Sequence, residues 1–110
     1  MNRNKLIWIL TAADPLAANL EELLQMDGYS CTIYKDIREI KAALPQQFPR
    51  AFVLDELNNR GCYAELLPIL TGEKNPKLIV LHSDSDKAAF PMADSCLGLP
   101  GSINIIADVL

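Results

Sequence analysis

Histidine and closely spaced cysteine are almost missing from the sequence. It has one histidine, His82, and three cysteines, Cys31, Cys62 and Cys96, which form no CxxC pair. This scarcity argues against a zinc site, because such sites need four closely spaced cysteine or histidine ligands. An odd number of cysteines also argues against a disulfide framework, so we interpret all three as small apolar residues.

Basic clusters and long apolar runs are missing as well. Ten lysines and arginines are scattered along a chain with a net charge of −4. Nucleic-acid binding depends on contacts to phosphates, so we predict no direct contact with nucleic acid. No apolar segment is long enough to cross a bilayer, and the apolar run before Asp14 and Pro15 is too short for a secretory signal. We therefore expect no membrane contact and a cytoplasmic location.

Hydrophobic residues, by contrast, make up half of the 110 positions. This content suits one domain, 1–110, with a modest core, and leaves no room for a second domain. Short apolar segments rich in β-branched residues predict strands, most of them continuous enough to be buried on both faces. Trp8 lies in the first and is expected in the core. The predicted strands cover residues 5–11, 29–34, 51–55, 77–82 and 95–97.

Helix signals separate these strands. Asp14 is expected to cap a first helix, with Pro15 in its first turn and Gly28 at its end. Asp36 and Glu39 have the spacing of a capping box and begin a second helix. A third helix covers 62–67, and Pro68 is expected to kink or shorten it. A weak helix lies within 83–93, and a last one covers 103–110.

Alternating strands and helices predict an α/β fold with a parallel sheet covered by helices on both faces. Ligand sites in such sheets lie beyond the carboxyl ends of the strands. Here those ends are 11–14, 55–58, 82–84 and 97–100. Candidate functional residues should therefore be sought in these four loops.

Four segments contain these loops together with the strands before them: LIWILTAADP, AFVLDELNNRGCYAELL, KLIVLHSDSD and ADSCLGLP. In sequence and spacing they resemble the receiver domains of response regulators along nearly the whole chain. The resemblance implies a flavodoxin-like (βα)5 receiver fold with a central five-stranded parallel sheet. It also implies two-component signalling. In such domains acidic residues hold Mg²⁺ and one aspartate accepts a phosphoryl group. A hydroxyl and a lysine amine then contact the phosphoryl oxygens.

The residues at these implied positions mostly lack that chemistry. Asp55 occupies the phosphoacceptor position and is retained, but Ala12 and Ala13 replace the acidic pair. His82, followed by Ser83, replaces the hydroxyl residue, and Leu99 replaces the lysine before Pro100. Mg²⁺ prefers several oxygen ligands, so we predict no metal and no cofactor at this degenerate pocket. It comprises Ala12, Ala13, Asp14, His82, Ser83 and Leu99, beside an Asp55 that we expect to be inactive.

The spacing between the last two motifs predicts a further departure. His82 and Leu99 are only 17 positions apart, with Pro91 between them, so the fourth helix should be shortened or irregular. This places in doubt the dimer that receivers usually form with the fourth helix, fifth strand and fifth helix. The chain also ends early in its last predicted helix, and we expect a fragment of a longer regulator. The general sequence pattern of this chain is similar to that of the N-terminal domains of enhancer-binding transcriptional activators.

We therefore predict a non-enzymatic pseudo-receiver that acts through protein contacts, with a protein partner, a second copy or an output domain. Two alternatives remain open. Asp55 could serve as an active phosphoacceptor by an atypical route, or the crevice at the strand ends could bind a small ligand as a sensor. A structural role for Asp55, bonding the backbone N–H groups of the following turn, is the plainest interpretation of that residue.

Overall fold

The central sheet has five parallel strands in the order β2-β1-β3-β4-β5. A computed structural model describes residues 5–44, 47–70, 76–83, 89–99 and 103–110. The order β2-β1-β3-β4-β5 is that of flavodoxin-like folds, so the predicted fold class and its five-stranded parallel sheet are confirmed. The strands are β1 Leu6–Leu10, β2 Ser30–Tyr34, β3 Ala51–Asp55, β4 Lys77–His82 and β5 Ser95–Gly98. Strands β1, β3 and β4 are interior to the sheet, where continuous apolar runs can be buried on both faces.

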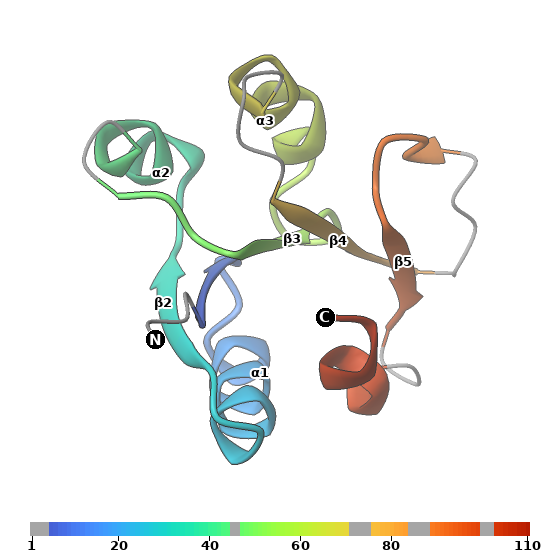
Figure 1. Ribbon diagram of the computed structural model, residues 1–110. Coiled ribbons are helices and arrows are strands. Elements are labelled where there is room, and N and C mark those ends of the chain that lie inside the picture. Colours follow the sequence, from blue (N-terminus) through green and yellow to red (C-terminus); the bar gives the residue numbers. More distant parts are fainter. Residues whose placement is uncertain (1–4, 45–46, 71–75, 84–88, 100–102) are drawn as a thin grey trace.

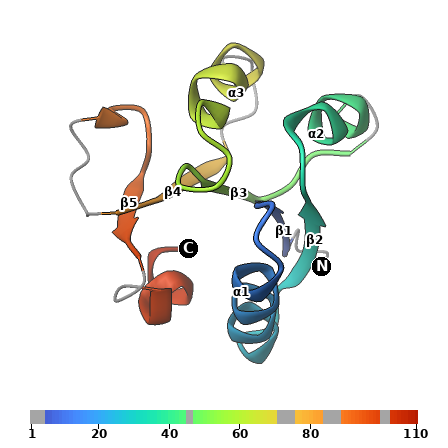
Figure 2. The same cartoon turned by 180° about the vertical axis from the view of Figure 1, so that it is seen from behind.

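Helices cover both faces of this sheet (Figures 1 and 2). Helix α1 (Asp14–Met26) and the 3₁₀ helix η2 (Ile103–Val109) lie on one face, and α2 (Ile37–Ala43) and α3 (Cys62–Leu70) lie on the other. Two hydrophobic cores result. The upper core contains Trp8 and Phe52 and lies under α2 and α3. The lower core contains Ile9 and Val53 and lies against α1 and η2. Neighbouring residues of one strand enter opposite cores, as the two-residue period of a strand requires.

The ends of α1 and α2 test the capping predictions. Gly28 has a φ of 88° at the end of α1, and Asp36 caps α2, as predicted. The reciprocal bonds of a capping box differ, because Asp36 accepts from the Arg38 N–H and Glu39 accepts from the Lys35 N–H. The prediction that Asp14 caps α1 is wrong. The N-cap is Ala13, and no side chain caps that position. Asp14 already lies inside the helix, with its carboxylate free for an ion pair described below.

Two other helix predictions need correction. Helix α3 is not shortened at Pro68, which is exposed, but continues to Leu70. A proline within a helix removes one backbone hydrogen bond, and the other contacts of α3 with the core outweigh that loss. The last helix is a 3₁₀ helix instead of an α-helix. In a 3₁₀ helix residues three apart align, and this places Ile103, Ile106 and Val109 together against the lower core.

The region of the expected fourth helix contains no α-helix in residues 83 and 89–94, where a turn includes Pro91. Its remaining part, 84–88, lies outside the described residues. The same holds for Pro45, which we expect to stop the second helix, and for Pro100, which we expect to begin the last one. The three cysteines are free, and Trp8 is fully buried, as expected. Within the described ranges, no helix combines the length and apolarity needed to span a membrane.

Helix α2 should depend on one side chain for its attachment. Ile40 is its only residue that is fully buried, so Ile40→Ala should lower the free energy of unfolding by about 2–5 kcal/mol. Ile105→Ala is the matched control, because Ile105 on η2 is 45% exposed and should cost less than about 1 kcal/mol. Urea unfolding of both variants checks this, and equal losses would contradict it.

Candidate functional site

The candidate site lies at the carboxyl ends of β1 and β3, which pair in the middle of the sheet. Thr11 directly follows β1, and Asp55 is the last residue of β3. Both are fully buried, and they are the polar residues of the core among those that the structure describes. Because a buried carboxylate is costly without donors, the groups around Asp55 decide what this site can do.

The Asp55 carboxylate accepts four hydrogen bonds. Its Oδ2 accepts one from Thr11 Oγ1 at 2.6 Å and one from Asn58 Nδ2 at 2.7 Å. Its Oδ1 accepts one from the Leu57 N–H at 3.0 Å and one from the Asn58 N–H at 3.1 Å. Two side chains and two backbone groups thus occupy the lone pairs of both oxygens. This arrangement includes the backbone contacts that the plainest interpretation of Asp55 predicted.

Asn59 connects the same turn to two other loops. Its Oδ1 accepts a hydrogen bond from the Ala12 N–H at 2.8 Å, and its Nδ2 donates one to the Lys35 carbonyl at 2.9 Å. The Ala13 N–H donates to Thr11 Oγ1 at 3.0 Å. The loops after β1, β2 and β3 are therefore tied together by amide and hydroxyl groups. The two alanines contribute backbone donors here, where the implied metal site needs oxygen ligands.

Asp14 and Lys35 form an ion pair at the outer side of this network. Lys35 Nζ lies 2.6 Å from Asp14 Oδ1, and both side chains are more than half exposed. An exposed pair of this kind contributes roughly 0–1 kcal/mol, so it orients the loops more than it stabilises the fold. The contact also directs the Asp14 carboxylate toward Lys35.

The remaining predicted positions lie apart from Asp55. The half-buried His82 ring contacts the Phe90 ring edge-on, with centroids 5.3 Å apart, and Ser83 Oγ lies 3.5 Å from His82 Nδ1. Leu99 packs partly buried against the lower core, and its N–H donates to the His82 carbonyl. Within the described part of the chain, none of these three side chains has a hydrogen bond to Asp55. The structure thus joins Ala12 and Ala13 to the Asp55 network and leaves His82, Ser83 and Leu99 outside it.

Glu56 has a role that the sequence analysis missed. It accepts hydrogen bonds from the Gly61 and Tyr63 N–H groups, and Cys62 Sγ lies 3.5 Å from its Oε2. Glu56 therefore satisfies donors at the start of α3. Burial, followed by the nearby Glu56 charge, raises the pKa of the Cys62 thiol well above its usual range. This cysteine stays protonated and is a poor nucleophile.

The sequence analysis placed Thr11 and Asn58 in candidate loops but did not predict their contacts or those of Asn59. The run LDELNN signals a turn rich in side chains that bond nearby backbone, and this part was predictable. Contacts to residues 44 or more positions away, such as Thr11 to Asp55, have no local signal. They depend on the pairing of β1 with β3.

The implied Mg²⁺ does not fit these residues. Both Asp55 oxygens already accept two hydrogen bonds each, and neighbouring Ala12 and Ala13 have no side-chain oxygen. Mg²⁺ needs octahedral oxygen ligands and loses its waters reluctantly. In the described ranges, no three His, Cys, Asp or Glu side chains are grouped to hold a metal.

Thr11 should be important for stability. Thr11→Val keeps the shape of the side chain and removes a donor to a buried carboxylate, so we expect a loss of about 1.5–3 kcal/mol in the free energy of unfolding. Thr32→Val in the half-buried edge strand β2 is the matched control and should change stability by less than about 1 kcal/mol. Urea unfolding measures both. Similar stability of Thr11→Val and wild type would mean that the hydroxyl contributes little.

Comparisons with known proteins agree with this fold at low sequence identity. No protein-family model and no curated protein sequence matches the chain. Among solved structures, it is similar to a CheY-like receiver domain from Methylobacillus flagellatus, with 22% identity and a TM-score of 0.75 over 98% of this chain and 100% of that one. A response regulator from Thermotoga maritima matches with 14% identity and a TM-score of 0.80, over 96% and 93% of the two chains.

A third similar structure is the beryllofluoride-activated NtrC receiver domain, with 22% identity and a TM-score of 0.74 over 99% of this chain and 93% of that one. At these identities the similarity establishes the backbone arrangement and leaves the chemistry to the residues of each chain. The chain described here has the CheY-like receiver fold of these structures, with a hydrogen-bonded network at the carboxyl ends of β1 and β3.

Proposed function

We propose that this chain is a non-enzymatic signalling domain, a pseudo-receiver, that has lost the phosphorylation switch and acts through protein contacts. The observation that carries the proposal is the saturated Asp55 carboxylate, held by Thr11, Leu57 and Asn58. An oxygen that attacks a phosphoryl donor must be accessible, and Asp55 is 0% exposed. A cytoplasmic location and a place in a longer regulator of transcription belong to the same proposal.

The surrounding positions support it further. A phosphoryl group brings negative charge that must be neutralised by cations and donors held in place. At the expected lysine position, Leu99 has no charge and packs toward the lower core. Lys35, the cation of the neighbouring loop, is engaged by Asp14. Phosphorylation of Asp55 would thus break several hydrogen bonds while no described cation is poised to stabilise the product.

The hollow beside Asn59 does not favour a small-ligand sensor that uses the crevice at the strand ends. Its volume is about 130 Å³, and it is lined by Asp36, Ile37, Asn59, Arg60, Cys62 and Glu65. Pockets for small molecules typically enclose roughly 300–1,000 Å³. A compact polar network at the strand ends is better suited to holding the loops in one arrangement, which a protein partner can then recognise.

An NMR titration tests the loss of the switch against the alternative of an active phosphoacceptor. Amide spectra should stay unchanged at Ala12, Asp55 and Leu99 when Mg²⁺ and then beryllofluoride are added. Beryllofluoride mimics a phosphoryl group on aspartate, so an active site would respond at these residues together. Mg²⁺-dependent shifts at these residues, lost in Asp55→Asn, would show a working phosphoacceptor and overturn the proposal.

Restoring the missing groups should restore the response. Ala12→Asp and Ala13→Asp add carboxylates beside Asp55, and Leu99→Lys adds an amine. We expect the triple variant to bind Mg²⁺ at millimolar concentration, whereas Ala12→Asn, Ala13→Asn and Leu99→Met together, a matched uncharged control, should not. Isothermal calorimetry and the same amide spectra measure this. Mg²⁺ binding by the wild type equal to that of the triple variant would contradict the proposal.

A further inference from the structure

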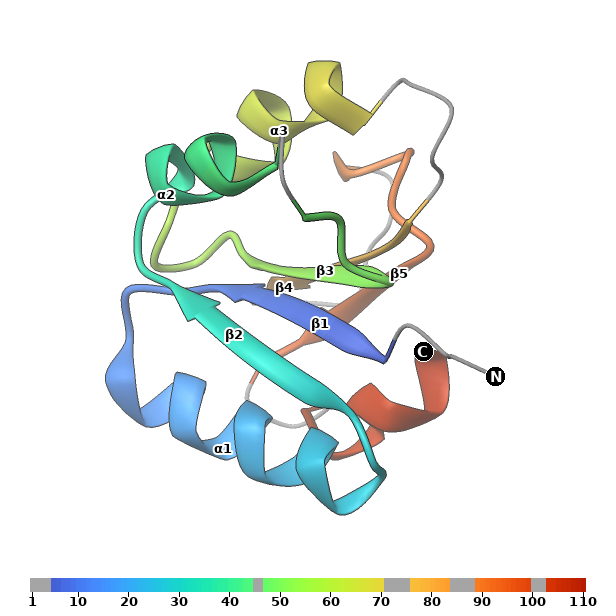
Figure 3. The same cartoon turned by 60° about the vertical axis from the view of Figure 1, so that its left-hand side comes forward.

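Strand β2 forms one open edge of the sheet. It pairs with β1 alone, and Figure 3 shows it in front of the sheet with α1 on one side and α2 on the other. All its residues except the exposed Ser30 are half-buried. A strand in this position presents backbone N–H and C=O groups that can pair with another strand.

The hydrogen bonds to β1 identify which groups point outward. The Ser30 N–H donates to the Lys5 carbonyl, and the Tyr34 carbonyl accepts from the Thr11 N–H. In a parallel ladder alternate residues bond the same neighbour, so Ser30, Thr32 and Tyr34 face β1. Cys31 and Ile33 therefore direct their N–H and C=O groups away from the sheet.

Both ends of this outer edge are closed. The Tyr29 N–H donates to the Leu24 carbonyl, the Lys35 N–H donates to Glu39 Oε1, and the Lys35 carbonyl accepts from Asn59 Nδ2. No backbone partner for Cys31 or Ile33 on the outer side is found among the described residues. The available edge is thus limited to two residues, with two outward groups each.

The side chains of β2 do not protect this edge. Natural edge strands are commonly blocked by charged residues, proline or bulges. The sequence SCTIY has none of these, and β1 and β2 pair without a bulge. The opposite edge strand, β5, is shorter and ends at Gly98. Strand β2 is therefore the edge better suited to a further strand.

We propose that a second copy of this chain binds at β2, with the two β2 strands antiparallel about a two-fold axis at Thr32. This inference rests on the proposed function and names the partner and surface for its protein contacts. The two sheets would continue into one another, with α1 beside its symmetry mate on one face and α2 beside its mate on the other.

The register follows from the outward groups. With Thr32 opposite Thr32 of the second copy, each Cys31 lies opposite an Ile33, and such a pair exchanges both of its backbone hydrogen bonds. All outward groups of both copies are then satisfied, in four hydrogen bonds. A register with Cys31 opposite Cys31 of the second copy would place Ile33 opposite Tyr29. The Tyr29 N–H already donates to the Leu24 carbonyl, so this register leaves an Ile33 carbonyl without a donor. One centred on Ile33 pairs Cys31 with Lys35, whose backbone groups are both used.

The side chains agree with this register. Thr32 meets Thr32 in a non-hydrogen-bonded pair, where side chains are close and threonines can bond one another. No like charges within the strand oppose each other. Two five-residue strands bury little area, so the dimer should be weak, with a dissociation constant in the micromolar range or above.

A cross-linking experiment tests the register. In the proposed dimer the Thr32 Cα atoms are about 4.5 Å apart, which is within the range for a disulfide. Thr32→Cys should therefore cross-link into a dimer with diamide, whereas Ser30→Cys, the control, faces Tyr34 and should not. Burial raises the pKa of the Cys31 thiol to about 11, so this native cysteine should react slowly near neutral pH. Equal cross-linking of both variants, or of neither, overturns the register.

Sedimentation velocity over a range of concentrations tests the dimer itself. Thr32→Lys places two like charges opposite each other and should raise the dissociation constant about tenfold or more, while Thr32→Val should keep it within about threefold of wild type. A monomeric wild type at the highest concentrations, or equal affinity of both variants, overturns the inference. That outcome leaves the proposed function intact, because the Mg²⁺ and beryllofluoride titration tests it separately.

Discussion

A carboxylate buried at the end of β3 is the constraint on which the rest of the site depends. Removing Asp55 from water is costly unless donors replace the lost hydration, and no ion pair with Asp55 occurs in the described part of the chain. The Thr11 hydroxyl, the Asn58 amide and two backbone N–H groups supply these donors. The turn after β3 and the loop after β1 take the positions that these bonds require.

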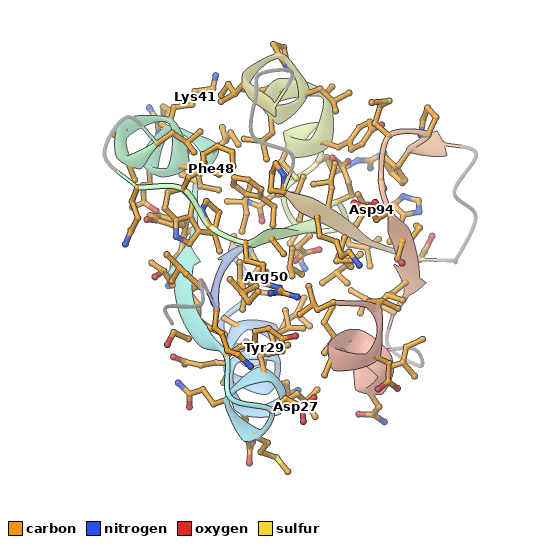
Figure 4. The ribbon with its side chains drawn as sticks, viewed as in Figure 1. Asp27, Tyr29, Lys41, Phe48, Arg50 and Asp94 are labelled. Atoms are coloured by element: carbon orange, nitrogen blue, oxygen red, sulfur yellow. The ribbon has the colours of Figure 1, made fainter. Side chains whose placement is uncertain are left out.

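The same network extends outward in a defined order. Asn59 joins the loop after β1 to the loop after β2, and Lys35 in the latter reaches Asp14 at the start of α1. Figure 4 shows the side chains that lie between the sheet and the helices on its two faces. Each contact uses a neutral amide, a hydroxyl or an exposed ion pair. We interpret this as a set of fixed loops on a receiver fold, in which uncharged donors surround the aspartate. A domain built in this way can offer a constant surface to a partner, and the unprotected edge of β2 is the surface that we propose for it.

Much of the backbone was predictable because the signals are local. Continuous apolar runs predicted β1, β3 and β4, and the Asp36–Glu39 spacing predicted the start of α2. Errors arose where tertiary context decided. Asp14 was expected as a cap, yet it lies inside α1 and pairs with Lys35 from another loop. The predicted shortening at Pro68 does not occur, and α3 runs to Leu70. The last helix takes the 3₁₀ form, which aligns Ile103, Ile106 and Val109 with the core.

The sequence by itself determined the strand order along the chain, the loops that hold the candidate residues, and the absence of acidic and lysine side chains at Ala12, Ala13 and Leu99. These are properties of residue type and local periodicity, which need no knowledge of distant contacts. Only the tertiary structure decided that Thr11 reaches Asp55 and that Cys31 and Ile33 face outward. Both depend on how strands far apart in the chain pair side by side, because register sets which groups meet and which remain free.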